Sequence, residues 1–345
     1  MPDLRSPALR RTASLRCVST SAPAGALAVA VASLLFAVNG TVAKLAMQAG
    51  LSPTRLVEFR SVGSAIILMT IAIVVVRRRM RLRRSELVVM AVLGVVGMAL
   101  VQWLYLVAIS RLPVGLALLI EYTAPLMVAL WARFVLGETV RPRVWWALAA
   151  CLAGLALVAQ VRSGITLDAV GLAAAFGAAL CLATYYLLGE RLVAHRDPLS
   201  TQAWSFALAG AFWLILLPVW NLQTAILADD VALPGSGITA PLWALVVWIV
   251  VLGTVVPYTL VLAGLKVIGA ARAGLIGMIE PVAASAAAWV VLGERMSPVQ
   301  VAGGAVVLVG VGLAETARRS RHDLTGMDTE VLPPTAAHAP SPARP

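Results

Sequence analysis

The sequence has little of what soluble enzymes and metal-binding proteins are built from. Charged residues make up 12% of its 345 positions, against about 25% in an average soluble domain. It has three histidines and three cysteines, and it lacks Gly-x-Ser-x-Gly, His-Glu-x-x-His and P-loop patterns. These absences argue against an intramembrane hydrolase, a divalent-metal carrier and a transporter with its own ATPase domain. We therefore predict that the protein is not an enzyme, holds no metal and needs no cofactor.

Apolar residues are abundant instead. They make up 61% of the chain, and the mean hydropathy is +0.92. A helix needs about 20 apolar residues to cross the hydrocarbon core, and a helix satisfies its own backbone polar groups there. The sequence therefore predicts an all-α integral membrane protein with ten transmembrane helices. Their approximate bounds are 25–47, 54–76, 86–108, 113–135, 143–161, 168–189, 200–220, 241–264, 270–292 and 297–317.

The position of the basic residues explains the net charge of +11. With ten spans and a cytoplasmic N-terminus, most lysines and arginines fall on the inside, above all those of the loop 77–84. The charge therefore predicts a multi-pass protein of the cytoplasmic membrane with both termini in the cytoplasm. Its predicted partners are the lipid bilayer and a small solute rather than nucleic acid. The terminal segments 1–23 and 318–345 are of low complexity and are predicted to be disordered tails.

One pattern, Pro-x11-Gly-Glu-x3-Pro, occurs twice. It begins at Pro125 and again at Pro281, and both copies lie in apolar sequence. The chain is therefore predicted to consist of two five-helix repeats, 24–162 and 165–317. Because five is an odd number of spans, the second repeat enters the membrane upside down relative to the first. Such inverted repeats are typical of secondary transporters that expose one site alternately to each side.

The paired pattern, the Glu280–Pro281 dipeptide and the arginine loop resemble the ten-helix drug/metabolite transporters of the EamA type, over roughly residues 25–317. The segments Thr41–Lys44 and Glu121–Pro125 are similar to the threonine/homoserine exporter branch. The resemblance implies a secondary transporter that exports small metabolites, above all amino acids, across the cytoplasmic membrane by alternating access. Two alternatives of the same fold are a proton-coupled multidrug or organic-cation exporter and an uncoupled facilitator.

Ionisable side chains at membrane depth are costly, so they point to a transport site. Glu121 lies in the fourth predicted span, one turn before Pro125, where the helix is predicted to break. We expect Glu121 to bind substrate or to couple protons; the alternative is a buried carboxyl held by a neighbouring side chain. Glu280 precedes Pro281, where a second helix break is predicted. The favoured role of Glu280 is to help close the inner half of the molecule, and the alternative is a role in the site.

Three more charged residues fall within the first two predicted spans. Glu58 lies one turn from Arg55 and is expected to pair with it, whereas Arg60 needs a partner on another helix. We expect an Arg60–Glu121 or Lys44–Glu121 pair to form a gate or a clamp for a zwitterionic solute. The alternative for Lys44 is that its long side chain reaches the headgroup region.

Other polar residues fall into two groups. Asn39, Gln102 and Tyr105 are expected to line a cavity, with bridging between helices as the alternative interpretation. Tyr122, next to Glu121, is a further candidate for the substrate-binding or coupling site. Glu138 and Glu294, one in each copy of the repeated pattern, are expected to cap or pack against helix ends. Runs of small residues permit close packing of helices, either within the protein or at a homodimer contact.

Overall fold

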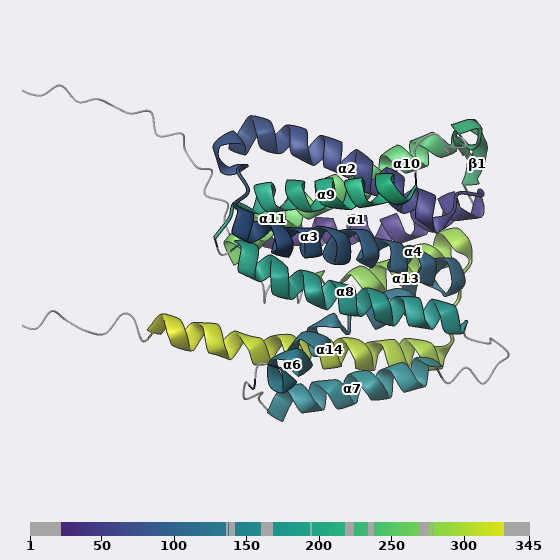
Figure 1. The fold of residues 1–345 in the computed structure, drawn as a ribbon. Coiled ribbons are helices and arrows are strands. Elements are labelled where there is room, and N and C mark those ends of the chain that lie inside the picture. Colours follow the sequence, from purple (N-terminus) through teal and green to yellow (C-terminus); the bar gives the residue numbers. More distant parts are fainter. Residues whose placement is uncertain are drawn as a thin grey trace, which may run out of the picture.

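The computed structural model describes residues 22–135, 137, 142–159, 168–193, 195–217, 224–233, 238–268, 276–277 and 279–327. Figure 1 shows long helices that run alongside one another in a bundle. Within the described residues, six helical segments are long and apolar enough to cross a membrane: Pro23–Gln48, Pro53–Arg79, Arg84–Arg111, Ala169–Val193, Pro198–Leu216 and Leu242–Val261. The protein is thus a helical membrane protein, and helical structure occurs in each of the ten predicted segments.

The two halves have corresponding helices. The first half contains α1 (Ala22–Gln48), α2 (Pro53–Val76), α3 (Leu87–Gly94), the π-helical η3 (Val95–Leu100), α4 (Val101–Arg111), α5 (Val114–Glu121), α6 (Ala124–Phe134) and α7 (Pro142–Ala159). The second half contains α8 (Ala169–Val193), α9 (Pro198–Leu216), α10 (Leu242–Val250), the π-helical η6 (Val251–Val255), α11 (Val256–Ile268), α13 (Ile279–Leu292) and α14 (Pro298–Met327). Short helical turns lie at Arg77–Arg79, Arg84–Glu86 and Thr224–Ala228.

Residues at equivalent places in the repeats adopt the same backbone conformation. Gly137 and Gly293, the glycines of the repeated pattern, have φ angles of +66° and +67°. After α13, the Gly293 N–H donates to the Trp289 carbonyl at 3.1 Å, and the Glu294 N–H donates to the Ala288 carbonyl at 3.3 Å. A left-handed residue of this kind ends a helix without a Cβ clash. The pattern therefore marks a helix end at which the following glutamate is placed.

The last helices of the two halves, α7 and α14, pack against each other, as Figure 1 shows. The contact is reciprocal. A Cβ at Gly154 would meet the Val307 nitrogen at 2.8 Å, and a Cβ at Gly310 would meet the Cys151 nitrogen at 3.0 Å. Cys151 and Val307 occupy equivalent places in the repeats, as do Gly154 and Gly310. Reciprocal contacts between equivalent residues are those expected across a two-fold axis.

Replacement of Gly154 by valine should separate α7 from α14. The added side chain would stand 2.6 Å from the Gly303 carbonyl oxygen, and backbone cannot move aside as a side-chain tip can. We expect a loss of about 3 kcal/mol of stability, measured as a lower melting temperature of the purified protein in detergent. Gly189→Val is the matched control, because nothing lies within 4 Å of a Cβ at Gly189 in α8. Equal melting temperatures for the two variants would contradict the close contact.

Two features in the less apolar parts were not predicted. The strands β1 (Asp230–Leu233) and β2 (Ile238–Pro241) pair antiparallel between α9 and α10, as a small addition to the helical fold. Their β-branched residues favour strands, which an apolar-run criterion does not detect. Helix α14 continues to Met327, past the predicted tail boundary at 318, in a stretch without proline. Helix α1 likewise begins at Ala22; the rest of both predicted tails lies outside the described residues.

Candidate functional site

The fourth predicted span is not one continuous helix. Helix α5 ends at Glu121, and α6 begins at Ala124 with Pro125 in its first turn. In the second half, α13 begins at Ile279, so Pro281 also lies in a first turn. A proline there has no intrahelical N–H bond to lose. Pro125 thus starts a new helix rather than kinking an existing one, and interrupted helices are where transporters hold their solutes.

The Arg60 side chain extends from α2 to the π-helical turn η6. Its side chain is buried, with the residue 5% exposed. Its Nε donates to Thr254 Oγ1 at 2.7 Å, and its Nη2 lies 3.4 Å from the Gly253 carbonyl. Thr254 in turn donates its own hydroxyl proton to the Ile249 carbonyl at 2.9 Å. The guanidinium is therefore held in a fixed orientation by two partners and keeps further N–H donors.

Tyr122 and Glu280 link the break after α5 to α13. The Tyr122 hydroxyl lies 2.8 Å from Glu280 Oε2 and 3.1 Å from the Gly277 carbonyl oxygen. A phenol has one proton, so it donates to one of these acceptors at a time. The contact joins the break after α5 to the start of α13. Glu280 therefore has a hydroxyl partner in the opposite repeat, and its carboxylate lies at the meeting point of the two halves.

Arg60, Glu121 and Glu280 lie close enough together to interact electrostatically, with Tyr105 and Tyr258 in the same group. Among the described residues, however, no direct ion pair joins Arg60 to Glu121, so the predicted pair is not formed. In the same part of the chain, the Glu121 carboxylate has no ion pair or hydrogen bond. A fixed cation and an unpaired carboxylate thus share one region at membrane depth.

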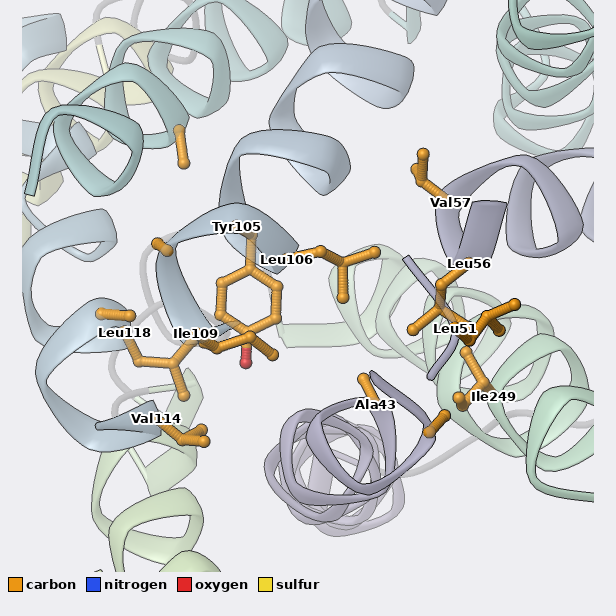
Figure 2. Packing of buried hydrophobic residues seen from close by; sticks show 14 of the residues in the cluster. Ala43, Leu51, Leu56, Val57, Tyr105, Leu106, Ile109, Val114, Leu118 and Ile249 are labelled. Atoms are coloured by element: carbon orange, nitrogen blue, oxygen red, sulfur yellow. The ribbon is translucent and has the colours of Figure 1, made fainter. Parts of the chain in front are cut away.

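Tyr105 places a hydroxyl beside this group. Its ring lies on α4, and Figure 2 shows the hydroxyl directed between the helix that carries Val114 and the helix that carries Ala43. A Cβ at Gly40 on α1 would stand 2.5 Å from that hydroxyl, so the absence of a side chain there admits the tyrosine. Tyr105 therefore approaches α1 and α5 closely from α4.

Asn39 and Gln102 bring buried amide groups to the same region. Asn39 packs against Gly253, where a Cβ would overlap its side chain, so it lies beside the turn that holds Arg60. Gln102 lies one turn before Tyr105 on α4, with its Nε2 4.0 Å from Met98 Sδ. Neither Asn39 Oδ1 nor Gln102 Oε1 has a hydrogen-bond partner in the described residues. Unpaired buried acceptors are costly, so each suits a donor from a solute or water.

Lys44 and Glu58 lie away from Glu121. The Lys44 Nζ forms an ion pair with Glu294 at 2.5 Å, so the predicted Lys44–Glu121 pair is wrong. Lys44 lies level with the start of α5, whereas Glu121 ends that helix, about 10 Å further at 1.5 Å per residue. Glu58 pairs with Arg55 at 2.7 Å, as the spacing of three residues predicts. Glu294, expected to cap a helix end, accepts the Val114 N–H at the start of α5.

Two site residues carried no signal of their own in the sequence. Thr254 and Tyr258 are uncharged and lie in an apolar run. The π-helical turns η3 and η6 that organise this region contain Gly97 and Gly253, which occupy equivalent places in the two repeats. π-helical turns are frequent at functional sites. The repeated glycines were therefore the signal that could have led to Thr254.

A second group of ion pairs lies at the opposite end of α2. Arg196 Nη1 lies 2.8 Å from Glu86, and Arg79 Nη1 lies 3.1 Å from Asp197. Arg196 also donates to the Arg81 carbonyl at 3.0 Å. These contacts tie the arginine-rich loop after α2 to the turn between α8 and α9. Inter-repeat ion pairs therefore lie at both ends of the bundle.

Comparison with known proteins identifies the family of this chain. The model of the EamA-like transporter family matches residues 23–160 and again residues 169–316. The chain belongs to the EamA-like transporter family. The two matches correspond to the two sets of helices described above. An EamA-like protein with several membrane-spanning helices is a membrane transporter.

Individual EamA-like relatives are similar at modest identity. The threonine/homoserine exporter RhtA of Escherichia coli (strain K12) is 28% identical over 225 residues, which cover 63% of this chain and 68% of that protein. The uncharacterized inner membrane transporter YicL of Salmonella typhimurium is 26% identical over 86% of this chain and 97% of its own length. A solved crystal structure of a protein with 20% identity matches 86% of this chain and 99% of its own, with a TM-score of 0.56. That last likeness concerns the fold alone.

Proposed function

We propose that the protein exports amino acids across the cytoplasmic membrane by alternating access, and that it binds the solute as a zwitterion between Arg60 and Glu121. One observation carries the proposal. A fixed guanidinium and a carboxylate without a partner among the described residues lie in electrostatic range of each other, yet form no direct pair. Each is therefore available to an opposite charge on a solute.

The chemistry of the site matches both ends of an amino acid. The remaining N–H donors of Arg60 suit a carboxylate, because a guanidinium binds that group in a two-pronged geometry. Glu121 suits an ammonium group. The unpaired oxygens of Asn39 and Gln102 suit further donors, such as a second N–H or a side-chain hydroxyl. A cationic drug would use the carboxylates but would leave the buried Arg60 without a function.

The arrangement of the two repeats suits the movement that alternating access requires. Glu121 ends a helix at the break in the first half, and Glu280 begins one in the second half, with Tyr122 joining them. Relative motion of two inverted repeats about such a centre opens the site to one side and then the other. The positive-inside pattern supports a cytoplasmic location for both termini, and the name of the RhtA relative supports an outward direction for amino acids.

Export by cells that express the protein tests this proposal. The cells are preloaded with labelled threonine, homoserine or other amino acids, and efflux is compared with that of cells carrying an empty vector. Two analogues serve as controls: threoninol, which lacks the carboxylate, and 3-hydroxybutyrate, which lacks the ammonium group. We expect amino-acid efflux that exceeds efflux of either analogue by about tenfold or more, because each charged contact is worth at least 1.5 kcal/mol.

Two results would contradict the proposal. Equal efflux of threonine and threoninol would show that the carboxylate is not bound. Resistance to cationic dyes without amino-acid efflux would favour the multidrug alternative, with Glu121 and Glu280 as the cation site. Proton coupling is tested in the same cells by collapse of the proton gradient, which should slow efflux if a site carboxylate exchanges protons.

A further inference from the structure

Lys44 and Glu294 hold the linker between α4 and α5 from both sides. The Lys44 Nζ donates to the Leu112 carbonyl at 2.9 Å, and Glu294 Oε2 accepts the Val114 N–H at 3.0 Å. Pro113, the residue between them, has no N–H to donate. The two side chains also pair with each other and are 14% and 18% exposed. We call Lys44, Glu294 and the two backbone groups that they bind the linker clamp.

The clamp controls one end of a short rigid helix whose other end is in the site. Every residue of α5 from Val114 to Ile120 is buried, so the helix is held along its length. Its first turn presses on α13, because a Cβ at Gly115 would overlap the Ser285 side chain. Glu121 is the last residue of this helix, about 10 Å from Val114. A tilt of α5 at the clamp would therefore displace the Glu121 carboxylate.

We propose that the linker clamp is a gate, and that Lys44 and Glu294 are positioning residues for Glu121. The two side chains belong to different repeats, so relative motion of the repeats at this end must part them. Parting them releases the Val114 N–H, because Glu294 belongs to the other repeat, while Lys44 and the Leu112 carbonyl stay in the first repeat. Helix α5 is then free to tilt about its linker. The link to a solute rests on the proposed function, whereas the effect of the clamp on α5 depends on no solute.

The position of α5 can be followed with a thiol probe. In the full-length chain with its native cysteines replaced by serine, Leu118→Cys reports from the buried face of α5, which Figure 2 shows beside Tyr105. Glu294→Ala should raise the rate at which a membrane-impermeant thiol reagent labels this cysteine about tenfold or more, because a charge-assisted bond is lost. Ala203→Cys, buried on α9, is the matched reporter and should label at an unchanged rate.

Two further variants separate a clamp from a simple ion pair. Glu294→Gln keeps an oxygen for the Val114 N–H, so its labelling rate should lie between those of the unaltered chain and Glu294→Ala. The double exchange Lys44→Glu with Glu294→Lys restores the attraction but can hold neither backbone group, so labelling should stay fast. Slow labelling in the double exchange would overturn the clamp and leave an ion pair alone.

The remaining outcomes distinguish the clamp from the proposed function. Unchanged Leu118→Cys labelling in Glu294→Ala, with an unaltered melting temperature, would overturn the clamp whether or not amino acids are exported. Faster labelling of both reporters would show general loosening and would also overturn it. Faster labelling of Leu118→Cys alone in a protein that exports no amino acid would support the clamp while the proposed function fails.

Discussion

Arg60→Gln should reduce amino-acid export at least about 30-fold, measured as the ratio of maximal rate to KM in preloaded cells or vesicles. Arg60 is the buried guanidinium whose remaining N–H donors we assign to the solute carboxylate. Glutamine is neutral and has no planar fork, so the carboxylate would enter a site that no longer compensates its charge. The variant should also lose its preference for threonine over threoninol, because that preference depends on the carboxylate contact.

Arg60→Lys tests whether export needs only a positive charge or also the planar guanidinium group. Lysine keeps the positive charge, but it cannot bind Thr254 and a carboxylate with one planar group, so we expect an intermediate loss of about tenfold. Arg83→Gln removes an exposed arginine from the loop after α2 and should export normally. Membrane abundance and melting temperature are measured for each variant. Normal export by a well-folded Arg60→Gln protein would show that Arg60 does not bind the solute.

The length of the apolar runs and the repeated pattern predicted most of the fold. A run of about 20 apolar residues leaves few alternatives to a membrane helix, so all ten segments contain helical structure. The paired glycines were predictable as equivalent positions, and Gly137 and Gly293 share one left-handed conformation. The hairpin of β1 and β2 was missed, because it lies outside the apolar runs from which the helices were predicted.

Partner choice among the charged residues was less predictable, for a physical reason. Glu58 pairs with Arg55 because the two are neighbours on one helix, which spacing alone reveals. Lys44 pairs with Glu294 because the left-handed turn after α13 brings that carboxylate to the end of α1. Such a contact depends on the placement of three separate elements. The sequence predicted Glu294 at a helix end and Glu121 within a span, but neither prediction brings Glu294 to Lys44.

The charged residues of the candidate site do not follow the symmetry of the two repeats. Backbone features recur at equivalent places, as the π-helical turns and the left-handed Gly137 and Gly293 show. The two carboxylates of the candidate site do not recur: Glu121 corresponds to Gly277, and Glu280 corresponds to Ala124. In the proposed mechanism, the similar backbones of the two repeats allow the movement, while a set of side chains that is not repeated forms one solute site.

Glu121→Gln should lower amino-acid export about 30-fold, with membrane abundance unchanged. The glutamine side chain has nearly the same shape and still offers an oxygen, but it lacks the negative charge that we assign to the solute ammonium group. A charge-assisted hydrogen bond is roughly twice as strong as a neutral one, and at membrane depth the uncompensated ammonium adds its own penalty. The variant should no longer distinguish threonine from 3-hydroxybutyrate, and any dependence of export on the proton gradient should disappear if Glu121 is the coupling group.

Glu58→Gln is the matched control for this substitution, because Glu58 is another buried carboxylate but is paired with Arg55 near the start of α2. Its export should change less than about threefold, since exchanging a carboxylate that meets no solute alters stability rather than binding. Glu280→Gln keeps an oxygen for the Tyr122 hydroxyl, so it should fall between the two. If Glu121→Gln exports as well as the unaltered protein while Glu280→Gln does not, the ammonium site belongs to the second repeat. Glu121 would then serve only to end α5.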